Sequence, residues 1–409
     1  MNKQTNTPEL RFPEFDEEWK KRKLGEVVNY KNGGSFESLV KNHGVYKLIT
    51  LKSVNTEGKL CNSGKYIDDK CVETLCNDTL VMILSEQAPG LVGMTAIIPN
   101  NNEYVLNQRV AALVPKQFID SQFLSKLINR NQKYFSVRSA GTKVKNISKG
   151  HVENFNFLSP NYTEQQKIGN FFSKLDQQIE LEEKKLELLE QQKKGYMQKI
   201  FSQELRFKDE NGSEYPNWKK RKIQDLMEVT SVKRIHQSDW QTSGVPFLRA
   251  RDIVAYNKGD KIEEPLFISN DKYNAYSKIS GKVEKGDLLV TGVGTIGVPF
   301  LIKDNKPLYF KDGNIIWLKN QKKLNENFLF YSFLSTSIQN YIKRVAGVGT
   351  VGTFTIKNAK KTPIFEPIKE EQEKIGNFFD KVDNLIKRQS DKIELLKQRK
   401  KGLLQKMFI

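Results

Sequence analysis

Two glycine-rich stretches are the first residues whose spacing could do chemistry. GVGTIG at residues 292–297 has the spacing of a dinucleotide-binding turn, follows the apolar run DLLVT, and has Asp312 twenty residues beyond Gly292. Such a site needs its glycines to open a helix, whereas the following VPFLIKDNKP, which contains Pro299, predicts a strand and a turn. GVGTVG at residues 347–352 follows a predicted helix instead of a strand. We therefore expect no nucleotide site at either stretch.

The cysteines and histidines form no catalytic or metal-binding pattern. Cys61, Cys71 and Cys76 fall within sixteen residues, are odd in number and have only His43 near them, which predicts neither a zinc quartet nor a disulfide framework. We interpret them as reduced and mostly packed thiols. The three histidines stand in scattered contexts, and the chain lacks GxxxxGK[ST], HExxH and an Asn-Pro-Pro-aromatic tetrad. The sequence thus predicts no catalytic site, no metal and no cofactor in this chain.

Basic and polar residues in loops that contain glycine or serine indicate nucleic acid instead. Flexible backbone near a phosphate offers amide as well as side-chain donors, Arg and Lys can read guanine, and Asn and Gln can read adenine. Any one of these residues, taken alone, is typical of solvent-exposed surface. The sequence does not distinguish residues that contact bases from residues that contact phosphates. The candidate DNA-contacting residues are Lys31, Asn32, Ser35, Gln87, Arg138, Lys143 and Lys145 in the first half, and Lys233, Arg234, Gln237, Arg249, Arg251, Thr291, Arg344 and Thr350 in the second.

The charge of the chain supports an acidic partner. The 409 residues carry 67 Lys and Arg against 48 Asp and Glu, a formal net charge of +19. Residues 1–160 hold +6 and residues 211–370 hold +10, whereas residues 161–210 are almost neutral at −1. A hydrophobic fraction of 38% excludes a disordered chain, and no apolar run approaches the ~18 residues of a membrane span. Without an apolar leader at its start, the protein is expected to be cytoplasmic.

The segments that are expected to position these loops occur twice in the sequence. EQQKIGNFFSKLDQQIELEEKKLELLEQQKKGYMQKIF at residues 164–201 recurs at residues 371–408 with 22 of 38 positions identical and an offset of 207. ELRF occurs at residues 9–12 and 204–207, and WKKRK at residues 19–23 and 218–222. A period of about 200 residues is far longer than that of a solenoid, which indicates a duplicated domain with two different surfaces.

Both near-identical segments are predicted to be long amphipathic helices. Their apolar residues are spaced by threes and fours between charges, and at 1.5 Å per residue a 38-residue helix is about 57 Å long. Thr163 and Gln166 fit a capping box at the start of the first helix, and the second helix has no Ser or Thr there. We expect the two helices to pack together as an antiparallel pair. The residues predicted for helix pairing and subunit docking are Ile168, Phe171, Phe172, Leu175 and Ile179, with Ile375, Phe378, Phe379, Val382 and Ile386 in the second copy.

Between the helices, short apolar runs bounded by Gly, Pro and Asn predict β-rich globular halves. These runs lie at residues 47–54, 79–85, 93–99, 109–115, 287–292, 298–302 and 314–319, with one helix per half near residues 121–135 and 325–342. The predicted fold class is α+β, with two mixed, β-rich domains joined by two long antiparallel helices that form a coiled coil with an internal pseudo-twofold repeat. The predicted boundaries are residues 1–160 and 204–366 for the domains, and residues 161–203 and 367–409 for the helices.

In this combination the chain resembles the specificity (S) subunits of type I restriction–modification systems. The resemblance rests on two divergent halves that each end in EQ-x-KIGNFF, on the RF-P-EF-x(3)-W entry at residues 11–19, and on the GD-apolar run at Gly286 and Asp287. It extends over effectively the whole chain. The first half has Asn77-Asp78 at the place of Gly286-Asp287, which leaves only a turn in doubt.

The resemblance implies a non-catalytic subunit with two target recognition domains, each reading one half of a bipartite, asymmetric double-stranded DNA site. The paired helices would fix the spacer, since rods of this length can hold two readers about one duplex turn, roughly 34 Å, apart. They would also dock two methyltransferase subunits, and restriction subunits would join that core. S-adenosylmethionine, ATP and Mg would belong to those partners. The alternative is a stand-alone, duplicated DNA-binding or scaffolding protein with a coiled-coil spacer.

Overall fold

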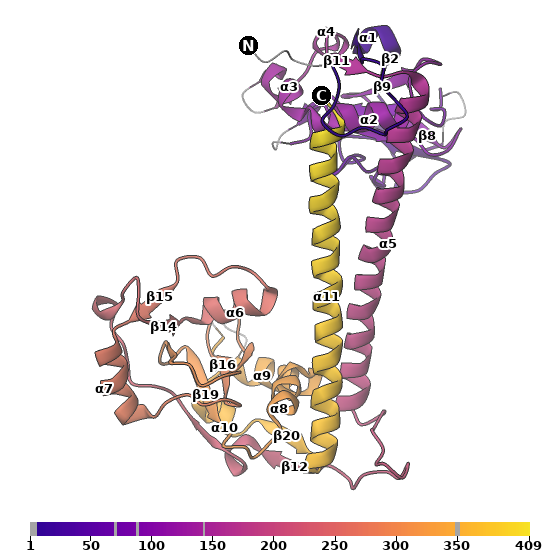
Figure 1. Ribbon diagram of the computed structural model, residues 1–409. Helices are drawn as coiled ribbons and strands as arrows, with labels where there is room; N and C mark the ends of the chain where they lie inside the picture. Colours follow the sequence, from indigo (N-terminus) through magenta and orange to yellow (C-terminus); the bar gives the residue numbers. More distant parts are fainter. Residues whose placement is uncertain (1–5, 69–71, 87–89, 142–143, 348–351) are drawn as a thin grey trace. The chain divides into compact units, whose positions relative to one another are not determined.

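The computed structural model describes residues 6–68, 72–86, 90–141, 144–347 and 352–409 (Figure 1). The chain divides into two compact units. Unit 1 comprises Met1–Glu183 together with Asp391–Ile409, and unit 2 comprises Lys184–Ser390. Each unit therefore contains one predicted globular half and a part of each long helix.

A four-stranded antiparallel sheet lies at the centre of unit 1. Its order is β2 (Val28–Asn32), β9 (Val110–Pro115), β5 (Leu80–Ile83) and β7 (Thr95–Ile97). All four residues of β5 are buried, as expected for a short, continuous apolar run covered on both faces. One face packs against α2 (Ser121–Arg130), whose Phe123 and Leu127 join Leu80 and Leu113 in the core.

Smaller elements complete unit 1. A three-stranded sheet has the order β4 (Tyr66–Ile67), β3 (Tyr46–Ile49) and β8 (Tyr104–Leu106), with β3 and β8 parallel. Two-stranded sheets join β1 (Lys20–Lys23) to β11 (Asn156–Ser159) and β6 (Ser85–Glu86) to β10 (Lys145–Asn146). The remaining helices are α1 (Leu24–Val27), α3 (Gln132–Arg138), α4 (Lys149–Glu153) and the 3-10 helix η1 (Glu37–Leu39).

Unit 2 repeats three of these four sheets, and among the described residues it has no counterpart of the β6–β10 pair. Its four-stranded sheet has the order β13 (Glu228–Thr230), β19 (Ile315–Lys319), β16 (Leu288–Thr291) and β17 (Pro299–Leu301). A three-stranded sheet follows the order β15 (Leu266–Ile268), β14 (Val245–Leu248) and β18 (Tyr309–Phe310), and β12 (Lys219–Lys222) pairs with β20 (Pro363–Glu366). Its helices are α6 (Ala250–Lys258), α7 (Asn270–Ser280), α8 (Glu326–Leu334), α9 (Thr336–Ala346), α10 (Ile356–Lys360), η2 (Ile223–Asp225) and η3 (Gln237–Asp239). The predicted α+β class and internal repeat are confirmed.

The two long helices are α5 (Tyr162–Phe201) and α11 (Lys369–Met407). Within unit 1 they run antiparallel, because Asp176 of α5 meets Lys400 of α11 and Glu183 meets Lys397. Within unit 2 they are antiparallel as well, with Lys193 against Asp383 and Tyr196 against Phe378. The predicted direction of pairing is therefore confirmed inside each unit.

The ends of several helices differ from the predictions. The cap of α5 is Asn161, whose side-chain oxygen accepts from the Glu164 amide, and not Thr163, which lies inside the first turn. The helices predicted at residues 121–135 and 325–342 are each two helices, because the chain breaks at Asn131 and at Ser335, whose hydroxyl caps α9. Unit 2 also contains α6 and α7, which the apolar pattern did not predict.

The turns that precede β5 and β16 correspond to each other, but with a shift of one residue from the predicted alignment. The amide of Asp78 donates to Ile98 and that of Gly286 to Ile302, and both residues have positive φ, 59° and 92°. Asp78 is thus equivalent to Gly286, and Thr79 to Asp287. Asp tolerates the left-handed region better than most residues, which explains how the first unit makes this turn without glycine.

Among the described residues, no helix combines the length and apolar character that crossing a membrane requires. In the same part of the chain, no group of three or more His, Cys, Asp and Glu side chains is arranged to hold a metal ion. Cys61 and Cys76 are free thiols, half-buried and exposed respectively, while Cys71 lies outside the described residues.

Candidate nucleic-acid interface

Sheet topology brings the candidate loops of unit 1 to one end of its central sheet. β2 and β5 both pair antiparallel with β9, so they point the same way and both end near Ala111. Lys31 and Asn32 are the last residues of β2, Ser35 lies in the loop that follows, and β6 leaves the end of β5. β6 in turn pairs with β10, which carries Lys145. Three separate stretches of sequence therefore meet at this end.

The same arrangement recurs in unit 2. β13 and β16 both pair antiparallel with β19, so the loop with Lys233 and Arg234 and the GVGTIG turn leave the sheet at the same end. The Lys311 amide donates to the carbonyl of Leu248, the last residue of β14, at 2.8 Å. This bond places the residues that follow β14 beside those that follow β18. As predicted, the GVGTIG turn joins two strands, β16 and β17, and opens no helix.

One backbone contact is shared by the two loop clusters. The Ile147 amide donates to the Leu84 carbonyl at 2.9 Å, and the Phe354 amide donates to the Gly292 carbonyl at 2.8 Å. Ile147 and Phe354 are 207 residues apart, the offset of the helical repeat. Each unit thus holds the segment that ends at Ile147 or Phe354 against the turn that follows its central strand.

The predicted contact residues of unit 1 are mostly exposed. Lys31 is ion-paired with Glu73 at 2.5 Å, and the Ser35 hydroxyl donates to Glu37 at 3.0 Å. Arg138 lies over the Tyr134 ring with its guanidinium carbon 3.8 Å from the centroid, a cation–π contact that leaves its outer edge accessible. Asn32 and Lys145 are exposed, and Gln87 and Lys143 lie outside the described residues.

Most of the unit 2 candidates also face solvent. Lys233, Arg234, Gln237, Arg251 and Arg344 are exposed, and Thr350 lies outside the described residues. Arg234 pairs with Asp312 at 3.0 Å. The hydroxyl of Tyr309 donates to the Lys233 carbonyl at 2.8 Å, and burial raises the pKa of Tyr309 to about 12, so the hydroxyl keeps its proton at neutral pH. This bond fixes the backbone from which Lys233 projects.

Two candidates are built into the fold. Thr291 is fully buried, and its hydroxyl donates to the Thr295 carbonyl at 2.6 Å and accepts from the Val298 amide at 2.9 Å. Arg249 makes a two-pronged pair with Asp252, at 2.8 and 2.9 Å, and also donates to the Glu264 carbonyl. Both side chains shape loops whose exposed neighbours remain the candidates for contact.

A buried ionic contact in each unit was not foreseen. Glu164, the first residue of the EQ motif, has no exposed surface and accepts from Arg11 Nε and Nη2 at 2.8 and 2.7 Å and from Trp19 Nε1 at 3.4 Å. Its hydrogen bonds raise the pKa of the Arg11 guanidinium. In unit 2, Glu371 accepts from Arg206 at 3.1 and 2.7 Å and from Trp218 at 2.9 Å. The only signal was the recurrence of RF, W and EQ in both halves.

The residues predicted for helix pairing and docking lie mainly against the globular domains. Ile168, Phe172, Ile375 and Phe379 are buried in the core clusters with α2 or α8, and Ile179 is buried as well. Phe171, Leu175, Phe378, Val382 and Ile386 are half-buried. The Phe172 ring contacts Phe408, which follows α11, within unit 1, and the Phe379 ring contacts Phe201 of α5 within unit 2. The fully buried side chains hold each unit together and offer no surface to a partner.

This duplicated fold with unlike loops defines a class of protein. The family described as "Type I restriction modification DNA specificity domain" matches residues 16–191 and 215–397, and the chain belongs to this family.

Individual relatives cover the chain from end to end. The type I restriction enzyme MjaVIII specificity subunit of Methanocaldococcus jannaschii is 23% identical over 425 residues, which span 98% of this chain and 95% of that protein. The crystal structure of the S subunit of a type I restriction–modification system from M. genitalium matches with a TM-score of 0.62 at 18% identity, covering 98% of this chain and 99% of that one. A chain from a structure on complex assembly and conformational transition of the type I R-M system gives 0.55 at 16% identity, covering 95% and 97%. These structural likenesses show the shared fold.

Proposed function

We propose that this protein is the DNA sequence-specificity subunit of a type I restriction–modification complex, and that each unit reads one half of a bipartite, asymmetric site. One observation carries the proposal: two units with the same strand order present unlike, basic loops at the same end of their central sheets. A common scaffold with divergent loops is what two different half-sites require, because phosphate contacts position a reader and side chains at base edges specify the sequence. The relatives named as specificity subunits support a recognition role without catalysis.

The partners follow from the same proposal. The long helices would dock two methyltransferase subunits, and restriction subunits would join them. Leucines that lie on the helices outside either core support such contacts: Leu188 is 58% exposed and Leu395 is 66% exposed. The methyl donor, ATP and Mg would be held by those partner subunits.

The test is a genome-wide profile of methyladenine in the host with and without this gene. We expect deletion to abolish methylation at one bipartite motif and to leave every other motif unchanged, and plasmid-borne wild-type protein to restore it. If the profile is unchanged in a strain with an active system, the proposal is wrong. A stand-alone DNA-binding protein would give that unchanged profile and would pull down no stoichiometric methyltransferase.

A variant that lacks three exposed charges of unit 2 makes the test specific for the proposed interface. Complementation with Lys233→Gln, Arg251→Gln and Arg344→Gln together should fail to restore methylation, because three exposed charges are lost where phosphates would lie. The matched control is Lys219→Gln with Lys220→Gln, two exposed lysines of β12, which precedes the central sheet. It should restore methylation fully. If the two variants behave alike, Lys233, Arg251 and Arg344 are not part of the interface.

A further inference from the structure

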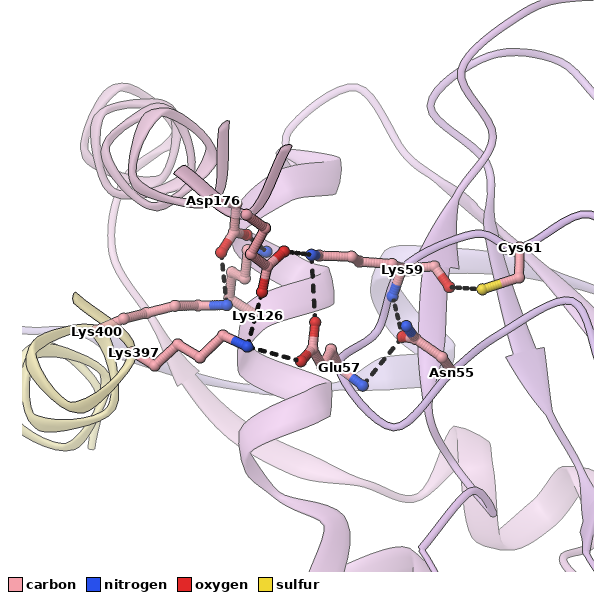
Figure 2. A network of polar contacts seen from close by, with 9 residues as sticks. Asn55, Glu57, Lys59, Cys61, Lys126, Asp176, Lys397 and Lys400 are labelled. Atoms are coloured by element: carbon pink, nitrogen blue, oxygen red, sulfur yellow. Dashed lines mark hydrogen bonds and ion pairs between the residues drawn. The ribbon is translucent and has the colours of Figure 1, made fainter. Parts of the chain in front are cut away.

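Unit 1 contains a cationic cavity that DNA reading does not use. It has a volume of about 760 Å³ and lies between the loop after β3, α2, α5 and the 391–409 part of α11. Its basic lining residues are Lys59, Lys126, Arg130, Lys397, Lys400 and Lys401. Among the described residues, the carboxylates that line it are Glu57 and Asp176. Figure 2 shows Lys126 and Lys400 directed at Asp176, and Lys59 and Lys397 gathered at Glu57.

The available carboxylates do not neutralise these cations. Asp176 is shared by Lys126 and Lys400, and the latter distance is 2.5 Å. Lys59 and Lys397 share Glu57 and the neighbouring Glu183, with the shortest distance, 2.7 Å, between Lys397 and Glu183. Three carboxylates therefore serve four lysines, before the remaining two cations are considered.

Neither Arg130 nor Lys401 contacts an Asp or Glu side chain in the part of the chain that the structure describes. Arg130 donates to main-chain oxygens of Ile409, the last residue of the given sequence, and of Gln405, at 3.2 and 3.4 Å. Burial lowers the pKa of Arg130, and burial together with Lys400 and Lys59 lowers the pKa of Lys126 despite its contact with Asp176. In both side chains the largest cause is burial, which disfavours the charged form.

Comparison of the two units shows that the fold forms without these basic lining residues, because unit 2 has other residues at several of the same positions. Asp176, Lys400 and Lys401 have counterparts at the 207-residue offset, Asp383, Lys193 and Lys194, but the counterpart of Lys397 is Glu190. The place of Lys126 is taken by Tyr331 of α8, whose hydroxyl donates to Asp383 at 2.7 Å. The corresponding cavity of unit 2 is smaller, about 240 Å³, and is lined by aromatic side chains and two aspartates, with only two lysines. The positive surplus is thus specific to unit 1.

We propose that the unit 1 cavity binds a small polyanion that carries a chain of phosphates. Lysine ammonium groups and an arginine fork are the side chains that bind phosphate oxygens most strongly, and the basic side chains of this lining outnumber the Asp and Glu side chains that contact them. The cavity size is within the usual range for a small-molecule site. Met94, Ile179 and Leu404 give part of the lining an apolar character, so a nucleoside could accompany the phosphates. Inorganic tripolyphosphate and a nucleoside triphosphate share this chemistry.

The test is calorimetric titration of the full chain with tripolyphosphate and, separately, with ATP, at constant ionic strength and without Mg. We expect one saturable site and an affinity at least 10-fold lower in the variant Arg130→Gln with Lys401→Gln. The matched control is Lys194→Gln, the unit 2 counterpart of Lys401, which should bind like the wild type. Lys401→Gln alone removes an exposed side chain without an ion pair and should weaken binding in a chain of unchanged melting temperature.

The outcomes separate the possible ligands. Tighter binding of ATP than of tripolyphosphate places a nucleoside over the apolar residues, and equal binding identifies an inorganic polyphosphate; both support the proposal. No saturable binding of either probe, or undiminished binding by the double variant, overturns it. So does displacement of both probes by a short DNA duplex that the double variant no longer binds, because the site would then hold backbone phosphates. The titration itself needs no DNA, so its failure leaves the proposed recognition function intact.

Discussion

In each unit a buried carboxylate at the start of a long helix binds the segment that precedes the first strand, at Arg11 in unit 1 and at Arg206 in unit 2. Glu164 has no exposed surface, and its partner Arg11 is 153 residues away in the sequence. A two-pronged guanidinium–carboxylate contact with an indole N–H as third donor satisfies both oxygens, which is the condition under which a buried ion pair is tolerated. Glu371 with Arg206 and Trp218 repeats this geometry in unit 2.

Removing one partner should therefore cost far more than removing a surface charge. We expect Arg11→Met to destabilise unit 1 by about 3–5 kcal/mol, because Glu164 would be left buried without its counter-ion. Hydrogen exchange would show lost protection in the peptides of unit 1 and unchanged protection in unit 2. Lys20→Met, an exposed change in β1, is the control and should stay within about 0.5 kcal/mol of the wild type. Wild-type protection in Arg11→Met would contradict the role of this contact.

At the residue scale, the sequence showed which residues recur in both halves but not which contacts those residues make. The repeated RF, W and EQ residues were visible, but helical and strand periodicities report contacts only between neighbours in the chain. Thr291 and Arg249 show the converse. Both have types that suit DNA contact, and only three-dimensional packing reveals that their polar groups are already engaged within the domain.

At the scale of elements, a glycine in each long helix permits close packing against a helix start. A Cβ on Gly169 would lie 2.9 Å from the Phe123 amide at the start of α2, and one on Gly376 would lie 2.5 Å from the capping oxygen of Asn325 at the start of α8. Gly195, in the same helix as Gly169, has nothing within 4 Å of such a Cβ. The KIGNFF motif thus contains the contact point between helix and domain.

These two glycines of α5 should respond to the same substitution with opposite signs. Gly169→Ala should destabilise unit 1 by about 1–3 kcal/mol through overpacking, whereas Gly195→Ala should stabilise the chain by about 0.5–1 kcal/mol by restricting the unfolded backbone. Thermal unfolding and hydrogen exchange of both variants measure the difference. Stabilisation by Gly169→Ala would show that α5 does not approach α2 this closely.

The elements themselves were largely predictable because their apolar runs are short and buried. All seven predicted runs contain a strand, and both long helices lie within two residues of the repeat. Helix breaks at Asn131 and Ser335 were missed because the apolar spacing continues across them. α7 was missed although Ser269 caps it and Gly281 ends it, because its apolar positions are few and its hydroxyl and amide side chains are typical of loops.

At the scale of the whole molecule, the exchangeable part of unit 1 lies between Trp19 and Glu164. Both of these residues and Arg11 fall outside residues 20–160, so replacing that segment with its counterpart from a related protein keeps the ionic contact that fastens the unit. The divergence of the two halves has accumulated inside this segment, while its flanks are repeated.

We expect an exchange of residues 20–160 to change one half of the methylated motif and to leave the other half intact. The reason is that unit 2 has its own sheet, core and loops. Sequencing of methyladenine in a strain that carries only the chimera measures this directly, with the unaltered chain in the same host as control. A change in both halves would be incompatible with one reader per unit.

Unit 1 is built from two stretches that are far apart in the sequence, and this determines the order in which the two units can complete folding during synthesis. Phe408 packs against Trp19, Phe123 and Phe172, so the core of unit 1 is incomplete until residues 391–409 exist. Unit 2, residues 184–390, is continuous. At about 5–20 residues per second, a ribosome needs on the order of 10–40 s to pass from one part of unit 1 to the other. The half that is synthesised first is therefore the half that is finished last, and its exposed apolar surface in that interval is a natural substrate for chaperones.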